Sequence, residues 1–231
     1  NKALAEIRKS YSCMVAGDQH LGSVIHHGID RWNDAGYSFC VPSIANFWLR
    51  WWDPAEPGMN RKQGSPAYTG EFNDGFGNKI TVHAVANPTL PEIEEGGKLS
   101  TRAAGFGVIR FNKANREITF ECWGRNMDIT DPESRQYPGW PVTIAQRDNY
   151  PMEDGYELPE LRISEPDQVV TVIASPSGEV VSSLRIKGSS FQPRVPQPGT
   201  YDILVGEGER QQKLQRIEAA SRNRKKLEVN F

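Results

Sequence analysis

The chain has 231 residues and a mass of 25.9 kDa, enough for one domain of ordinary size or one domain with a small appendage. Charged residues make up 24% and hydrophobic residues 37% of the sequence, a balance that excludes disorder throughout. A formal charge of -2 provides no basic field to recruit nucleic acid, and no apolar run approaches the roughly 20 residues that a membrane span needs. We therefore expect neither a nucleic-acid partner nor a membrane span.

Short apolar runs interrupted by 21 Gly and 16 Pro predict more strand than helix in the first part of the chain. Residues 2–10 have the pattern of the last turns of a helix. Alternating or apolar runs predict strands at residues 11–16, 37–41, 80–86 and 142–145, and a hairpin over 107–111 and 117–123. The Gly- and Pro-rich stretch 53–78 is expected to be a long loop.

The composition changes after residue 165. Three short strands are expected at residues 168–174, 179–186 and 200–205, forming a small antiparallel β unit. From residue 209 the sequence becomes polar and predicts a helical tail. The expected domains are therefore residues 1–165, a β-rich appendage over 166–208 and a polar helical tail over 209–231.

The sharpest chemical motif is Gly17-Asp18-Gln19-His20, directly after an apolar run. In an extended chain, side chains two residues apart point the same way, which would bring the Asp18 carboxylate and the His20 imidazole together. Both groups are good ligands for Zn, Mn or Fe, and such a step can give one ligand to each of two neighbouring metals. The spacing alone leaves a second interpretation open, in which Asp18 caps a turn and His20 packs.

The stretch GDQHLGSVIHHGIDRWNDAGYSFCVPSIANFWLRWWDP at residues 17–54 resembles the C-terminal part of alkaline phosphatase D-like metallophosphoesterases. The stretches DGFGNKITVHAVANP at residues 74–88 and LRIKGSSFQPRVPQPGTY at 184–201 fit the same resemblance. The resemblance implies an α/β fold: the C-terminal part of a calcineurin-like two-sheet sandwich, followed by a small antiparallel β unit and, from the residue pattern, a C-terminal helix.

The resemblance also implies a metal-dependent phosphatase or phosphodiesterase that hydrolyses phosphate esters at a two-metal site, with Fe, Zn, Mn or Ca as candidate ions. Its last metal motif matches Asp18 and His20. The earlier motifs of such enzymes lie upstream of this one, so the chain is expected to need a missing N-terminal half of the same protein and to be inactive alone. An exported bacterial enzyme, periplasmic or extracellular, is implied as well.

Other residues have both a functional and a structural interpretation. His26 or His27 would reach substrate phosphate or a metal, or they are ordinary residues of the segment after the motif, whereas His83 is expected to be structural. The cluster Arg50-Trp51-Trp52-Asp53 would line a substrate mouth, because aromatic rings with a cation suit phosphate esters, or it belongs to the core and its rim.

A second function remains open. The β unit and the aromatic residues also suit a non-catalytic β-rich binding or structural module of a cell-surface or exported protein. The sequence that precedes this chain in its gene separates the two hypotheses, because the hydrolase needs further metal motifs there.

Overall fold

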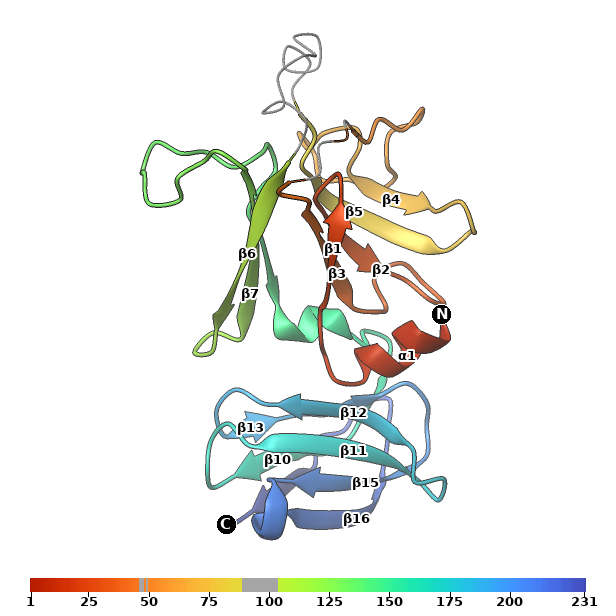
Figure 1. The fold of residues 1–231 in the computed structure, drawn as a ribbon. Helices are drawn as coiled ribbons and strands as arrows, with labels where there is room; N and C mark the ends of the chain where they lie inside the picture. Colours follow the sequence, from red (N-terminus) through yellow and green to blue (C-terminus); the bar gives the residue numbers. More distant parts are fainter. Residues whose placement is uncertain (46–47, 49, 89–103) are drawn as a thin grey trace. The chain divides into compact units, whose positions relative to one another are not determined.

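The computed structural model describes residues 1–45, 48, 50–88 and 104–231. The chain divides into two compact units, which are described separately. Unit 1 comprises residues 12–149 together with Asn1, and unit 2 comprises residues 2–11 and 150–231. Both units are built mostly from β-strands (Figure 1), as the high Gly and Pro content predicted. Among the described residues the only α-helix is α1 (Lys2–Arg8).

The larger sheet of unit 1 has five strands in the order β1-β3-β2-β5-β4. β1 and β3 pair in parallel, whereas the other neighbours are antiparallel. β1 is an edge strand, and it starts three residues later than the strand predicted at residues 11–16. The five strands are β1 (Met14–Gln19), β2 (Ser23–His27), β3 (Tyr37–Pro42), β4 (Gly70–Asn73) and β5 (Lys79–Val85).

The second sheet of unit 1 is antiparallel and includes the predicted hairpin. It has the order β6-β7-β8 and is followed by a short 3-10 turn, η2. Alternate residues of the two sheets meet in one buried cluster, where Phe39 of β3 contacts Phe120 of β7 and the nearby Trp140. The two sheets of unit 1 therefore share one buried core. The elements are β6 (Gly105–Asn112), β7 (Glu117–Gly124), β8 (Val142–Ala145) and η2 (Gln146–Asn149).

Unit 2 contains an antiparallel four-stranded sheet in the order β12-β11-β15-β16 and two smaller sheets, β13-β10-β17 and β14-β9. Apolar residues alternate along β15, where Tyr201, Ile203 and Val205 are buried. The strands are β9 (Tyr156–Glu157), β10 (Glu160–Ile163), β11 (Val169–Ser175), β12 (Val180–Arg185), β13 (Ser190–Phe191), β14 (Arg194–Val195), β15 (Thr200–Val205), β16 (Gln212–Glu218) and β17 (Lys226–Val229), with a 3-10 turn η3 (Gly208–Arg210) before β16.

The predicted helical tail is wrong. Residues 209–231 form the strands β16 and β17 instead, and β17 pairs in parallel with β10. In β17, Leu227 and Val229 alternate with charged residues and join the core of unit 2. In β16, the positive φ of 55° at Arg216 coincides with a register shift against β15. The polar sequence of residues 209–231 resembles a helix because its alternating apolar positions are few and a bulge in β16 interrupts them.

The boundary between the two units lies between Asn149 and Tyr150 rather than after residue 165. β9 and β10 precede residue 165, yet β9 pairs with β14 and β10 pairs with β17, near the end of the chain. The first residues also belong to unit 2, where the Ser183 amide donates to the Lys9 carbonyl at 2.7 Å and the Lys9 ammonium pairs with Glu179 at 2.8 Å. These pairings are long-range in sequence, so the composition change near residue 165 could not locate the boundary.

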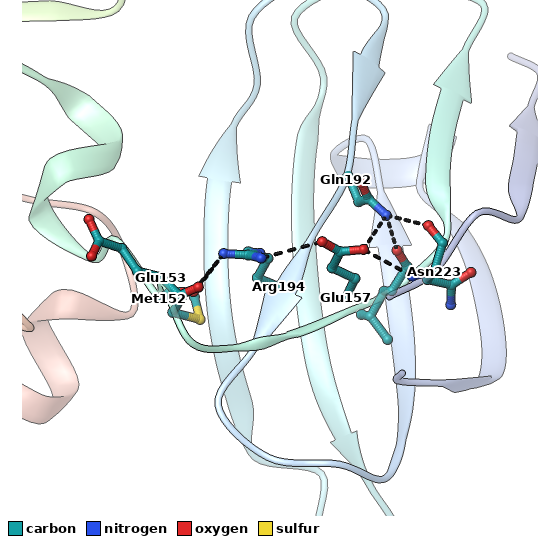
Figure 2. Close-up of polar contacts among 7 residues, drawn as sticks. Met152, Glu153, Glu157, Gln192, Arg194 and Asn223 are labelled. Atoms are coloured by element: carbon teal, nitrogen blue, oxygen red, sulfur yellow. Dashed lines mark hydrogen bonds and ion pairs between the residues drawn. The ribbon is translucent and has the colours of Figure 1, made fainter. Parts of the chain in front are cut away.

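A polar cluster holds the segment before β17 against β9 and β14 (Figure 2). The Glu157 carboxylate accepts a hydrogen bond from the Asn223 backbone amide at 2.9 Å and pairs with the Arg194 guanidinium at 3.3 Å. Arg194 also donates to the carbonyls of Met152 and Glu153, at 3.2 and 2.6 Å. The Asn223 amide, followed by Arg194, lowers the pKa of Glu157. The cluster joins three segments that are distant in sequence.

Loss of the Glu157 charge should therefore loosen the segment that follows β16. We expect Glu157→Gln to speed amide hydrogen exchange at residues 219–225 and to lower the unfolding midpoint of unit 2, because the neutral amide weakens two charge-assisted contacts. Glu209→Gln, an exposed carboxylate on η3, is the matched control. Exchange measured by mass spectrometry tests the difference, and equal exchange in both variants would show that Glu157 does not hold the segment.

Candidate functional site

The Gly17-Asp18-Gln19-His20 motif lies at the end of β1. The strand continues through Gln19 with an irregular register against β3 between Ala16 and Gln19. The backbone of Ser43 donates to the Gln19 carbonyl at 2.8 Å and fixes the end of this strand. The residues of β1 after Met14 are exposed, including Val15 with 57% of its surface accessible. The motif therefore stands at an open sheet edge, at the carboxyl end of a strand that is parallel to its neighbour.

Asp18, rather than Gly17, makes the local turn. Asp18 has a φ of 57°, in the left-handed region that Asp tolerates better than most residues. Gly17 has open space around its missing side chain and is not among the residues with positive φ. This kink interrupts the simple alternation of side chains, so the period-two argument for bringing Asp18 and His20 together does not hold at this strand end.

Asp18 and His20 have different surroundings. Asp18 is exposed, whereas His20 is half-buried, and its Nδ1 is buried without a hydrogen-bond partner. A buried polar atom without a partner is costly, so this nitrogen marks a position where a ligand or a further protein group would be favourable. Within residues 1–45, 48, 50–88 and 104–231, no group of three or more His, Cys, Asp or Glu side chains is arranged to hold a metal ion.

His26 and His83 lie together on the inner side of the larger sheet. The His26 ring stacks on Tyr37 with ring centroids 3.9 Å apart, and the His83 ring is 5.2 Å from Tyr37 and 6.1 Å from His26. Burial, with the nearby His83 adding to it, lowers the pKa of His26 to about 3. Burial also lowers the pKa of His83 and raises that of Tyr37. These rings belong to the interior of unit 1, where a neutral imidazole is favoured.

The third histidine of this region, His27, faces the opposite side of the sheet. Its Nε2 lies 2.8 Å from the Ser38 hydroxyl on β3. Burial lowers the pKa of His27, and Asp74 opposes this shift. The Ser38 contact accounts for His27 as an ordinary partner of its neighbouring strand, and sequence reasoning had left this interpretation open.

The predicted aromatic and cationic cluster is largely brought together. Arg50, Trp51 and Trp52 line one cavity of about 610 Å³ over the larger sheet, whereas Asp53 is exposed and is not part of the lining. Gln19, between the two predicted metal ligands, lies at the same cavity. Sequence reasoning missed the aliphatic floor of this cavity, which the half-exposed positions of alternate strand residues form.

The three cysteines are free. Burial raises the pKa of Cys13 and Cys40, and that of Cys122 to about 12. A raised pKa disfavours the reactive thiolate, which agrees with a packing role for these residues.

Comparisons with protein-family models, with curated proteins and with solved structures found no match for this chain. No helix within the described part of the chain is long and apolar enough to cross a membrane. The resemblance to metallophosphoesterases therefore stays a prediction from the sequence motifs.

Proposed function

We propose that this chain is part of a metal-dependent phosphoric ester hydrolase, with Asp18 and His20 each holding one ion of a two-metal site. The observation that supports this most is the end of β1, where an exposed carboxylate and an imidazole with an unpartnered nitrogen flank Gln19. Crevices at the carboxyl ends of parallel strands are common places for ligands in open sheets. The resemblance of residues 17–54 to alkaline phosphatase D-like enzymes supports the same assignment.

The two residues fit a metal in part. The Asp18 carboxylate offers an exposed anionic oxygen, and the orphaned nitrogen of His20 offers a neutral donor, a set that suits Zn, Mn or Fe and is less suited to Ca. Metals bound there would polarise a phosphoryl oxygen and lower the pKa of a coordinated water. The left-handed backbone at Asp18 turns its carboxylate away from the regular strand direction, and the Ser43–Gln19 hydrogen bond holds the turn in place.

The remaining ligands must come from elsewhere, because the described residues supply no third ligand in a suitable arrangement. We assign them to a further segment of the same protein that adds a strand to the open edge of β1. An uncovered strand edge with an exposed apolar side chain such as Val15 favours pairing with another chain segment. In this proposal unit 1 is the C-terminal part of a calcineurin-like two-sheet sandwich, and the isolated chain is inactive. The exported location rests on the resemblance alone.

The proposal is tested on the protein expressed with the sequence that precedes this chain in its gene. Metal content is measured by elemental analysis, and turnover with one generic phosphomonoester and one phosphodiester. We expect Asp18→Asn and His20→Ala each to lower metal content and to reduce turnover at least about 100-fold. Substituting residues that only contact metal ligands already lowers metal affinity or activity about 10–100-fold.

Asp30→Asn, another exposed carboxylate of unit 1, is the matched control and should leave both measurements unchanged. If Asp18→Asn and His20→Ala retain two metals and full turnover, the assignment of these two residues is wrong. If the longer protein hydrolyses neither ester, the hydrolase proposal itself fails.

The alternative function is a non-catalytic β-rich binding module, and the aromatic cavity of unit 1 is the observation that favours it. A binding module would take up a ligand at this cavity without turnover, and its properties would not depend on Asp18 or His20. Ligand binding by the chain combined with inactivity of the longer protein would therefore favour this second function.

A further inference from the structure

The two faces of the larger sheet in unit 1 differ. Its inner face packs on the second sheet through residues such as Val24 and Phe39, which are fully buried. On the opposite face, the alternate residues Ile25, Cys40 and Ile80 are only partly buried. Together with Val82 they form the floor of the 610 Å³ cavity. This volume lies in the range of small-molecule sites, which are mostly apolar with a few polar groups.

The wall of this cavity is held in a defined position. The Asn87 side chain accepts a hydrogen bond from the Trp52 amide and donates one to the Trp52 carbonyl, both at 2.8 Å. The Trp52 indole nitrogen donates to the Tyr68 carbonyl at 3.1 Å, and the ring meets Phe72 of β4 edge to face at 5.6 Å. Two contacts thus fix the backbone of Trp52 and two fix its indole above the aliphatic floor. A loop that merely lay on an uncovered sheet would not need this anchoring.

Two further side chains, Trp51 and Arg50, line the cavity beside Trp52. Trp51 lines the cavity with half of its surface exposed, and Arg50 contributes an exposed guanidinium. Within the part of the chain that the structure describes, the Arg50 guanidinium forms no ion pair. An indole surface favours a flat apolar body, whereas a guanidinium favours phosphate through paired hydrogen bonds.

We propose that this cavity binds a planar aromatic phosphate: the aromatic body lies on the floor against Trp51 and Trp52, and Arg50 pairs with the phosphate. Gln19 lines this cavity and lies between Asp18 and His20 in the sequence, so the cavity is next to the residues proposed to hold metals. In the proposed hydrolase the ligand is the substrate, an aryl-type phosphate ester, and this identification rests on the proposed function. The binding of the ligand does not.

The test uses this chain in the presence of a chelator and a probe that cannot be hydrolysed, naphthylmethylphosphonate. Isothermal titration should give a Kd below about 1 mM, which is modest for a site of this size. Methylphosphonate lacks the aromatic body and naphthalenemethanol lacks the anion, and each should bind at least about tenfold more weakly, because each loses one of two favourable contacts. The proposal would be overturned if methylphosphonate or naphthalenemethanol bound as tightly as naphthylmethylphosphonate, or if naphthylmethylphosphonate showed no saturable binding.

Variants locate the probe. Trp51→Ala and Arg50→Gln should each raise the Kd at least about tenfold. Trp48→Ala and Arg61→Gln are the matched controls, because both residues are exposed in unit 1 and neither lines the cavity. Trp52 is left intact, since its hydrogen bonds hold the wall itself. Equal effects of the cavity variants and the controls would contradict the assignment.

Alkylation of Cys40 provides a second measurement that does not require a variant of the cavity wall. Cys40 is on the cavity floor, and bound probe should slow its alkylation in a Cys13→Ser background, whereas Cys122 is buried. Binding without protection of Cys40 would place the probe elsewhere. In the longer protein, a Cys40 that is unreactive without probe would show that protein fills the cavity and would overturn the proposal. Because no turnover is measured, these outcomes are distinct from failure of the hydrolase proposal.

Discussion

Truncating Phe39 to alanine should lower the free energy of unfolding of unit 1 by about 3–5 kcal/mol, the usual cost of removing a fully buried aromatic ring. Phe39 is completely buried between Phe120 and Trp140, with ring centroids 5.5 and 5.6 Å away. The ring fills the space between the two sheets. No neighbouring side chain can fill the cavity left by Phe39→Ala without displacing both sheets. Urea denaturation followed by tryptophan fluorescence measures this directly, since all six tryptophans lie in unit 1.

The position opposite this ring provides a sharper version of the test. A Cβ on Gly107 would lie 2.5 Å from the Phe39 ring, closer than side-chain carbons approach. We therefore expect Gly107→Ala to destabilise unit 1 strongly in the presence of Phe39 and much less in the Phe39→Ala background, where Val41 Cγ1, at 3.2 Å, is the nearest remaining neighbour. Gly75→Ala, with open space around the new carbon, is the control. Equal effects of Gly107→Ala in both backgrounds would show that the two positions do not interact.

The strands were the most predictable part of the fold. The run at residues 80–86 and the hairpin around Lys113 were found because their apolar residues alternate and polar turns bound them. The tail was missed because β16 and β17 are stabilised by long-range pairing with β15 and β10 rather than by local sequence preference. The polar sequences of β16 and β17 are typical of a solvent-exposed helix when the strands that pair with them are not known.

The candidate site was predictable only as a set of residue types. The run at residues 11–16 predicted a strand that ends before the motif, but β1 continues through Gln19 and contains Asp18. The left-handed turn at Asp18 depends on the register of β1 against β3, which the sequence does not show. The Arg50–Trp52 cluster was recognised from its composition. Its floor could not be predicted, because Ile25, Cys40 and Ile80 come from three strands whose pairing order, β3-β2-β5, does not follow from the sequence.

We expect the stability of unit 1 to fall strongly at acidic pH because of the buried His26. His26 is neutral in folded unit 1, where its pKa is about 3 compared with 6.5 for an ordinary histidine. Between these values the unfolded chain binds a proton that the folded unit does not, so stability is fully present above about pH 6.5 and is lost as the pH falls toward 3. The pKa difference corresponds to a loss of about 4–5 kcal/mol at its limit, a large part of the stability of an ordinary domain.

Replacing His26 with phenylalanine should remove most of this acid dependence, because the new ring can still stack on Tyr37 and does not titrate. The free energies of unfolding of the wild-type chain and of His26→Phe should therefore converge or cross as the pH is lowered from 7 to 4, with the difference changing by about 3 kcal/mol. Tryptophan fluorescence follows unit 1, and unit 2, which contains none of the four histidines, is the internal control. Its stability, followed by amide hydrogen exchange of residues 150–231 in the same buffers, should be unaffected by the substitution at every pH. Parallel pH profiles for the two proteins in unit 1 would show that the buried His26 does not make the unit sensitive to acid.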